Sequence, residues 1–382
     1  MQKQYDYIIL GAGLSGLMMV LRMLDDPYFE DKQILLIDQN LKKGNDRTWS
    51  FWQQEPTFID HLITKTWSTI KVAGQEWQDD IKIDPYRYAS IEGSDFYTYA
   101  FAKAEATQNI TLLEARALQL NENQDGVQVE TDKGTYTSTQ VLNSLFDPTI
   151  LEKQQQYDVL QQHFLGWFIE TEQTTFDPDV ATFMDFSIPQ QGNCRFMYVL
   201  PTSPTEALFE YTLFSKTLLP EAEYEVAIKA YLDSIGISQY TIKRKEKGSI
   251  PMTCYPFEQH NTARIVHIGT AGGWTRPSTG YTFMYTIKKS TALLSFLKTG
   301  ATFRKFSKRS RSWYFDLILL DILSRKNEMG GAIFTTLFKK NPTERLFKFL
   351  DGETTLWEEF LLVLTPPPKE FVKSLFNKLL GR

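Results

Sequence analysis

Residues 5–16, YDYIILGAGLSG, decide the fold of this chain, because an apolar strand leads directly into a glycine turn. The segment LMMVLRMLDD at 17–26 continues with helical periodicity, and ILLID at 34–38 is a second apolar strand. Strand, glycine turn, helix and strand in this order are typical of a dinucleotide-binding βαβ unit. The sequence therefore predicts an α/β fold that contains a Rossmann-like parallel sheet.

The glycines of this turn have the spacing GxGxxG. We expect Gly11 to permit a tight turn, Gly13 to let the backbone approach a pyrophosphate, and Gly16 to let the helix pack closely on the strand. The pyrophosphate would lie at the helix N-terminus, where unpaired amides favour negative charge. Asp38 ends the second strand and is expected to accept hydrogen bonds from ribose hydroxyls. The residues predicted to bind the dinucleotide here are Gly11, Ala12, Gly13, Leu14, Ser15, Gly16, Asp38 and Gln39.

A second glycine-rich segment, IVHIGTAGGWTRPSTGYT, occupies residues 265–282. A strand, a glycine turn, Pro277, Gly280 and then a helix would form a second helix start that faces an anion. The segment resembles the second flavin-binding segment of the glutathione-reductase-type flavoprotein superfamily, which implies FAD as the ligand. Thr270 stands where many of those proteins have an Asp bonded to the ribityl chain. The resemblance implies flavin contacts from Gly269, Thr270, Pro277, Thr279, Gly280, Tyr281 and Thr282.

Composition limits the other classes of function. The chain has 382 residues, with 42% hydrophobic and 23% charged, which is normal for a globular protein with more than one packed region. A net charge of −5 does not favour nucleic acid as a partner. The two cysteines form no CxxC motif and the four histidines are scattered, so we expect no metal site. These cysteines, and a start (MQKQYD) without signal-peptide features, favour a cytoplasmic location.

The pattern of elements along the chain predicts three regions. Short alternating strands are expected in 68–90 and 111–145, a β-rich block in 164–214, a helix at 221–236, and mostly helices after 281. We assign residues 1–150 and 255–300 to a discontinuous FAD-binding domain. Residues 60–110 and 151–254 are expected to form a β-sheet substrate domain, and residues 301–382 a helical C-terminal region.

The C-terminal region is basic, with 15 Lys and Arg against 9 Asp and Glu in residues 301–382. Five of these basic residues lie in RKFSKRSR at 304–311, before the apolar run WYFDLILLDIL at 313–323. We expect Arg304, Lys305, Lys308 and Arg309 on one helical face, and an amphipathic helix in FVKSLFNKLLGR at 371–382. Two interpretations stay open: helices packed on the core with solvated basic faces, or peripheral attachment to the anionic inner face of the cell membrane.

Several motifs together resemble the lycopene cyclase family of carotenoid biosynthesis, and in particular its bacterial β-cyclases. GxGxxG is shared by many flavoproteins, whereas the other segments are more specific. The matching segments are GAGLSGL at 11–17, NDRTWSFW at 45–52, HFLGWFIET at 163–171, FMDF at 183–186, YVLPTSPTEALFEYTLFS at 198–215, GSIPMT at 248–253 and IGTAGGWTRPSTGYTF at 268–283.

The resemblance implies that the protein closes each acyclic end of lycopene to a β-ring, giving β-carotene via γ-carotene without net redox change. The family requires reduced FAD, with NAD(P)H as the electron source. Ring closure needs a proton at the terminal double bond, attack on the resulting cation by a second double bond of the polyene, and loss of a proton. The acid must stay protonated at neutral pH, which desolvation in an apolar cavity achieves for a carboxyl group. Reduced flavin would stabilise the cation, or take part in proton transfer; the sequence leaves both open.

Glu210 is the predicted acid, because it lies in the apolar strand ALFEYTLF at 207–214 and at the acidic position of the family's Glu-x-Thr segment. Asp185, in FMDF, is the second catalytic candidate. It would either orient Glu210 or serve a structural role, for example by pairing with Arg195.

Residues near the second strand offer further cofactor contacts. Arg47, Thr48 and Trp49 lie in the segment that reaches the flavin or the pyrophosphate in related flavoproteins, and Arg47 either neutralises phosphate or caps a surface loop. A set of aromatic residues either lines a polyene tunnel or fills the core: Trp49, Phe51, Trp52, Trp167, Trp274, Phe283 and Tyr285.

Two other classes of function share the flavin motifs. One is a flavin-dependent monooxygenase or desaturase-like oxidoreductase that acts on an apolar isoprenoid. The other is a non-catalytic carrier of carotenoid or flavin. Neither requires a buried acid such as Glu210, so this residue distinguishes a cyclase from both.

Overall fold

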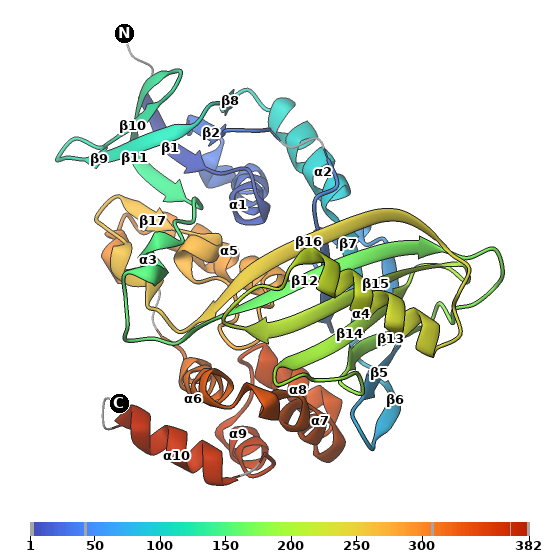
Figure 1. Cartoon of the computed structure of the whole chain (residues 1–382). Helices are drawn as coiled ribbons and strands as arrows, with labels where there is room; N and C mark the ends of the chain where they lie inside the picture. Colours follow the sequence, from blue (N-terminus) through green and yellow to red (C-terminus); the bar gives the residue numbers. More distant parts are fainter. Residues whose placement is uncertain (1–3, 42–43, 307–308, 367, 380–382) are drawn as a thin grey trace.

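A computed structural model describes residues 4–41, 44–306, 309–366 and 368–379, and contains three sheets (Figure 1). The first sheet has the strand order β8-β2-β1-β11-β10-β9, with β17 paired to β11. The pairs β1–β2, β2–β8, β1–β11 and β11–β17 are parallel, whereas β9 and β10 add an antiparallel edge. The strands are β1 (Gln4–Leu10), β2 (Ile34–Asp38), β8 (Ile110–Glu114), β9 (Ala117–Glu122), β10 (Val127–Thr131), β11 (Gly134–Asn143) and β17 (Ile265–His267).

Helices cover one face of this sheet, and the apolar side chains of its strands point alternately to that face and to the opposite one. Ile9 and Leu36 face α1 (Leu14–Leu24), while Ile8 and Leu35 enter a separate core on the opposite face. Helices α2 (Gly93–Glu105) and α5 (Phe283–Leu297) pack against α1. The predicted dinucleotide-binding unit is thus a parallel sheet with a buried helix, which confirms the expected fold class.

The second sheet is mainly antiparallel and has the order β16-β12-β15-β14-β13-β5-β6. Helix α4 (Glu221–Ser234) covers one face, as Figure 1 shows, and the other face packs against the C-terminal helices. The strands are β5 (Thr69–Ala73), β6 (Gln78–Lys82), β12 (Val159–Glu170), β13 (Val180–Asp185), β14 (Cys194–Pro201), β15 (Glu206–Ser215) and β16 (Thr241–Thr253).

A small sheet connects these two parts of the molecule. In it, β7 (Arg87–Glu92) lies between β3 (Thr48–Gln53) and β4 (Lys65–Trp67). The interval 60–110, which the sequence places in the ranges of both the FAD-binding and the substrate domain, contributes to more than one sheet. Strands β5 and β6 join the second sheet, whereas α2, which the strand pattern does not anticipate, packs into the core of the first.

Helices dominate the C-terminal region as expected, but its basic segment differs from the prediction. Residues 303–305 form a single 3-10 turn, and α6 begins only at Arg311, so Arg304 and Arg309 do not share a helical face. Lys308 lies outside the described residues. The remaining helices are the short α3 (Thr149–Glu152), then α6 (Arg311–Arg325), α7 (Gly330–Lys340), α8 (Thr343–Leu350), α9 (Leu356–Val363) and α10 (Pro368–Leu379).

The glycine turn shows two different constraints on side-chain size. Gly11 has φ +93°, a left-handed conformation that favours glycine. A Cβ at Gly16 would overlap the carbonyl oxygen of Gly11, whereas a Cβ at Gly13 would meet no atom within 4 Å. Gly16 is therefore required by the packing of the turn itself, and Gly13 leaves open space beside it.

We predict that Gly16→Ala lowers the free energy of unfolding by at least about 2 kcal/mol, because the backbone must move to admit a methyl group. Gly13→Ala is the matched control and should cost about 1 kcal/mol or less, since only its role at the helix start is affected. Thermal unfolding followed by circular dichroism measures both. An equal loss in the two variants would contradict this account.

Candidate active site

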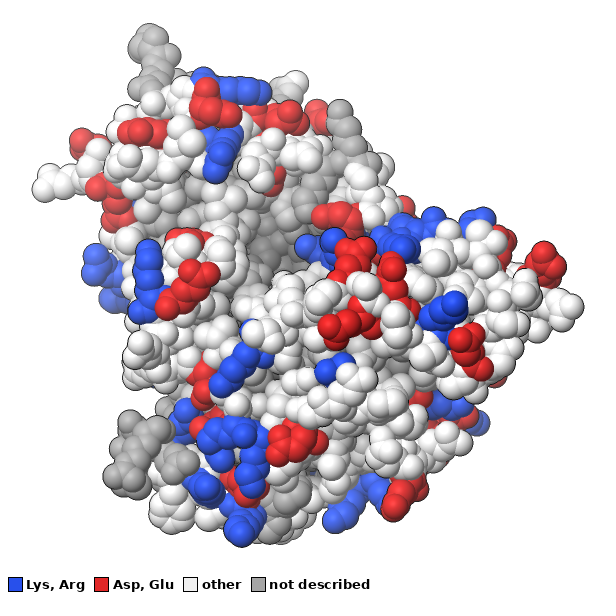
Figure 2. Space-filling model, in the orientation of Figure 1, with Lys and Arg blue, Asp and Glu red and all other residues white. Residues whose placement is uncertain are grey.

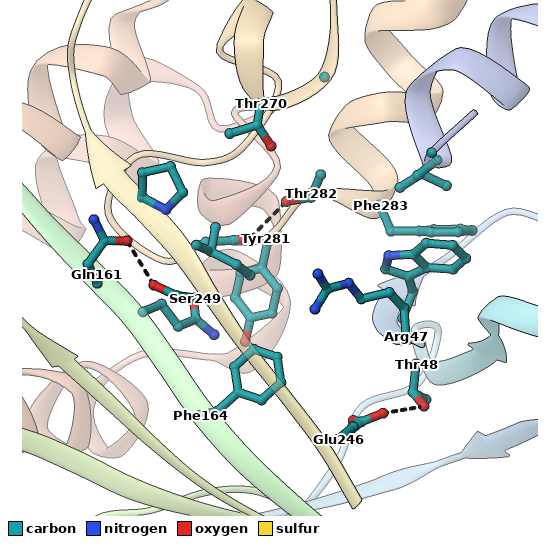
Figure 3. A pocket seen from close by; sticks show the side chains of 18 of the residues that line it. Arg47, Thr48, Gln161, Phe164, Glu246, Ser249, Thr270, Tyr281, Thr282 and Phe283 are labelled. Atoms are coloured by element: carbon teal, nitrogen blue, oxygen red, sulfur yellow. Dashed lines mark hydrogen bonds between the residues drawn. The ribbon is translucent and has the colours of Figure 1, made fainter. Parts of the chain in front are cut away.

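A cavity of about 850 Å³ lies where the three sheets meet. Both glycine-rich segments line it, through Gly13 and Ser15 from the first and Gly269 and Thr270 from the second. Strands β12, β15 and β16 supply the opposite wall, and residues 47–50 a third side (Figure 3). Segments that are far apart in the sequence therefore line a single cavity, which is open to solvent at the exposed Arg47.

The first glycine segment forms one end of this cavity. Leu14 and Ser15 line it at the start of α1, where the open space beside Gly13 would admit a phosphate group. The Asp38 carboxylate accepts hydrogen bonds from the amides of Ala12, at 2.6 Å, and Asn40, at 2.9 Å. It therefore holds the turn onto the end of β2. The neighbouring Gln39 side chain is exposed.

The second glycine segment closes against the first. Gly269 has φ +61°, and a Cβ there would come within 2.7 Å of the Ser15 Oγ. Thr282 precedes the first residue of α5, and Gly280, Tyr281 and Thr282 line the cavity beside Thr270 (Figure 3). The start of α5 thus faces the cavity, as the sequence pattern predicts for an anion-facing helix start.

Two predicted residues of this segment lie elsewhere. Pro277 lines a separate, smaller cavity of about 250 Å³ rather than the main one. Thr279 is buried and lines neither cavity, and its hydroxyl has no hydrogen-bond partner among the described residues. Both residues shape the loop instead of facing the main cavity.

A buried ion pair that the sequence analysis missed anchors this loop. The Arg276 Nε donates to Asp316 Oδ1 at 2.9 Å, and Ser278 Oγ donates to the same oxygen at 2.6 Å. Arg276 also donates to the Tyr285 hydroxyl and to the carbonyl oxygens of Phe349 and Leu350. The loop is thereby fastened to α6 and to the end of α8.

Residues 47–49 contact the cavity as predicted, although their partners were not foreseen. Arg47 is exposed and donates to the Lys247 carbonyl oxygen at 3.3 Å, and Thr48 donates to Glu246 Oε2 at 3.0 Å. Trp49 packs edge-on against Phe96, with ring centroids 5.5 Å apart. Figure 3 shows Arg47 extending into the cavity toward Tyr281.

Glu210, the predicted acid, lies on β15 and lines the same cavity. Its Oε1 accepts a hydrogen bond from the Thr212 hydroxyl at 2.8 Å. Three phenols, Tyr88, Tyr198 and Tyr281, line the cavity with it. Burial is the main cause that raises the pKa of Glu210, and the nearby charge of Glu246 adds to it. The carboxyl group is therefore held in its protonated form at neutral pH.

A second acid, Glu246 on β16, was not found from the sequence. It is buried, accepts a hydrogen bond from Thr48, and lies 3.6 Å from an Arg244 nitrogen. Burial raises the pKa of Glu246, while Thr48 and Arg244 lower it. Its setting, KRKEKGSIP, looks like a solvated charged strand. The only available signal was period-two alternation, which places Arg244 and Glu246 on one face and Lys245 and Lys247 on the other.

Asp185 does not join this site. Its Oδ1 accepts hydrogen bonds from the amide and hydroxyl of Ser187, and its Oδ2 accepts one from Tyr231 at 2.8 Å. It does not line the cavity that holds Glu210, and Arg195 donates instead to Tyr211 and Asn193. Asp185 therefore pairs with neither Glu210 nor Arg195, the two partners that the sequence suggested. Its contacts favour the structural role, at the end of β13.

Few of the predicted tunnel aromatics face the main cavity. Trp49 and Phe283 do, and Phe51 stacks on Phe283 from behind with ring centroids 4.3 Å apart. The others belong elsewhere: Trp52, Trp167 and Trp274 lie in the hydrophobic cores and Tyr285 borders the smaller cavity. Core packing, rather than the tunnel, accounts for most of the set.

Comparison with known proteins gives one consistent family. The family model described as "Lycopene cyclase protein" matches residues 6–376. A lycopene beta-cyclase of Pantoea ananas is 24% identical over 401 residues, covering 98% of each chain. A chloroplastic lycopene beta cyclase of Solanum lycopersicum is 23% identical and covers 97% of this chain and 77% of its own.

Solved structures show the same fold at low sequence identity. A flavin-dependent brominase superposes over the full length of both chains with a TM-score of 0.64 and 13% identity. A geranylgeranyl bacteriochlorophyll reductase-like protein from Thermoplasma acidophilum has a TM-score of 0.63 and 12% identity, covering 98% of this chain and 99% of its own. At this identity the likeness concerns the fold alone.

We predict that Asp316→Ala destabilises the protein by about 3–5 kcal/mol, because it leaves the Arg276 charge buried without its partner. Glu344→Ala, which removes the exposed Lys348–Glu344 pair, is the control and should cost under about 1 kcal/mol. Urea unfolding measures both. Equal small losses would show that Arg276 does not depend on Asp316.

Proposed function

The chain belongs to the lycopene cyclase family, and we propose that it is a lycopene β-cyclase that converts lycopene through γ-carotene to β-carotene. The observation that carries this proposal is Glu210, a carboxyl group with a raised pKa that borders the same cavity as both glycine segments. A protonated acid beside an apolar and phenolic wall is what polyene cyclisation requires.

Glu210 would donate its proton to the terminal double bond, which leaves a tertiary carbocation at the adjacent carbon. The next double bond along the chain then attacks this centre and closes the six-membered ring, which moves the positive charge into the ring. The ring cation loses one proton to form the β-ring, so the product has the same atoms and the same oxidation state as the substrate. The apolar side chains beside Glu210 would keep water from the cation, and the rings of Tyr88, Tyr198 and Tyr281, which line the same cavity, would stabilise positive charge.

The residues that line the cavity, together with Asp38 behind the first glycine segment, fit FAD. The open space beside Gly13 and the start of α1 suit the pyrophosphate, Asp38 lies at the end of β2 for the ribose, and the start of α5 with Thr270 suits the flavin end. When bound there in its reduced form, FAD supplies negative charge beside the cation, and we expect NAD(P)H to be the reductant.

We predict that the purified protein, given lycopene in liposomes with FAD and NADPH under anaerobic conditions, forms cyclised products without consuming NADPH in proportion. Chromatography of the carotenoids measures this. Unchanged lycopene would favour a carrier, and oxidation in proportion to NADPH would favour a monooxygenase or desaturase-like enzyme. Either outcome would overturn the proposed function.

Glu210→Gln should lower cyclisation at least about 100-fold while FAD binding, followed by flavin fluorescence, stays unchanged. The amide keeps the shape of the side chain but cannot deliver a proton. Glu206→Gln, an exposed acid on the same strand, is the matched control and should keep full activity. Full activity in Glu210→Gln would remove it as the acid.

The same proposal includes a membrane surface as partner, because lycopene is insoluble in water. No helix among the described residues is long and apolar enough to span a bilayer. Half of the large apolar side chains that are exposed in the described part of the chain lie between residues 356 and 376. They are Leu356, Trp357, Phe360, Val363 and Leu364 in and after α9, and Val372, Leu375 and Phe376 on α10.

This apolar surface agrees with the amphipathic helix expected at 371–382, which α10 forms over its described residues, but it differs from the expected one at 313–323. Helix α6 buries Leu320, Ile322 and Leu323 in the core, so the end of that run packs inward, whereas Tyr314 at its start is exposed. Helices α9 and α10 lie at the lower end of the molecule in Figure 1, and Figure 2 shows Lys and Arg gathered over this end. Exposed Lys369 and Lys373 flank the apolar residues of α10. An apolar face with basic flanks suits an anionic lipid surface.

Replacing both Trp357 and Phe360 with Ala should weaken binding to phosphatidylglycerol-containing vesicles at least about tenfold, since each exposed aromatic would lose its burial in lipid. Leu118→Ala, which removes an exposed apolar side chain on β9, should leave binding unchanged. Vesicle sedimentation measures the partition. Equal binding by the double variant and the unaltered protein would exclude α9 as the contact surface.

A further inference from the structure

The two acids of the cavity are aligned across a single strand. Strand β12 lies between β15 and β16, and its Gly166 is paired with Glu210 on one side and with Glu246 on the other. Residues directly opposite in a sheet project to the same face. Both side chains therefore leave the sheet on the face that borders the cavity.

Gly166 leaves the space between these two acids open. A Cβ at this position would come 3.6 Å from the Cβ of Glu210 and 3.3 Å from the Cγ of Glu246. It would also come 2.8 Å from a methyl carbon of Leu208, so a residue other than glycine does not fit here unless Leu208 moves. With no side chain between them, the two carboxyl groups interact electrostatically.

The surroundings of the two acids differ in one decisive respect. Cations and a hydroxyl donor accompany Glu246: Arg244 lies 3.6 Å away, Thr48 donates a hydrogen bond, and Arg47 lowers the pKa of Glu246 as well. Glu92 is the acid that opposes them. Glu210 faces Glu246 and three neutral phenols, Tyr88, Tyr198 and Tyr281, and among the described residues its hydrogen-bond donor is the Thr212 hydroxyl. Negative charge therefore costs less on Glu246 than on Glu210.

We propose that Glu246 is a positioning residue that stays ionised and keeps Glu210 protonated, so that the pair holds one proton across Gly166. This inference rests on the proposed function of Glu210 as the acid. When Glu210 gives its proton to the double bond, two negative charges face each other beside a carbocation. They stabilise the cation, and their repulsion favours return of one proton to Glu210 when the ring cation releases its own. No proton is gained or lost over the cycle.

The test is the pH profile of lycopene conversion by the FAD-loaded protein. Cyclisation should fall as pH rises through the raised pKa of Glu210. In Glu246→Gln the repelling charge is absent, so the midpoint of this fall should move down by about one pH unit, with activity recovered at lower pH. Glu246→Asp restores the charge and should restore the midpoint. Glu170→Gln, which removes an exposed acid paired with Lys243 on the same sheet, should leave it unchanged.

A second measurement does not depend on turnover. The infrared C=O band of protonated Glu210, assigned by its absence in Glu210→Gln, should titrate at lower pH in Glu246→Gln than in the unaltered protein. Thr48→Val, which removes the hydroxyl that donates to Glu246, replaces Glu246→Gln if that variant fails to bind FAD. It should lower the pH at which the Glu210 band titrates, because Glu246 without this donor is protonated more readily.

These readouts separate the two proposals. An unmoved Glu210 titration, or a loss of activity in Glu246→Gln that is equal at every pH, would overturn the positioning role. Absence of lycopene conversion in the unaltered protein would overturn the proposed function, while the infrared titration would still decide whether the two carboxyl groups are coupled.

Discussion

The register of β12 between β15 and β16 is the constraint on which the site depends. Each pairing sets which residues face the cavity, and a shift by one residue would turn every side chain of a strand to the opposite face. In the observed register, Gly166 has Glu210 on one side and Glu246 on the other. The long ladders of β12 make such a shift costly, since ten residues pair with β15 and twelve with β16. The stable pairing of these strands thus holds two acidic side chains on one face of the sheet, where each has less contact with water than it would have in the unfolded chain.

The second constraint is the attachment of the loop at 275–282 to the C-terminal helices. Burying Arg276 and Asp316 is expensive unless each finds its partner, and here the ion pair is supported by Ser278, Tyr285 and two backbone carbonyls. The loop must then follow a path that brings Tyr281 and Thr282 to the cavity and the start of α5 toward the first glycine segment. A charge pair remote from the acid therefore positions the flavin end of the proposed cofactor site. It also connects the cavity to α6, against which α10 packs.

The sequence predicted the parts whose signal is local. GxGxxG between two apolar strands requires close backbone approach at Gly16 and a left-handed turn at Gly11, and both are observed. Glu210 was found because an acid in an apolar strand is unusual and lay in a specific motif. Asp185 shared that appearance, yet its carboxylate is satisfied by Ser187 and Tyr231. Local sequence cannot separate a buried acid with partners from a buried acid beside a cavity, because the difference lies in residues from other elements.

By itself, the sequence determined the βαβ unit with its glycine turn, the α/β class and the place of Glu210 on an apolar strand, since each depends on residues that are near one another in the chain. Tertiary structure alone decided that Glu246, in a strand of lysines and arginines, faces Glu210 across a glycine. It also decided that α6 packs inward while α9 and α10 expose their apolar side chains. The physical reason is the same in each case. Burial and electrostatic coupling depend on which strands pair and which helices pack, and these contacts join residues that are distant in the chain.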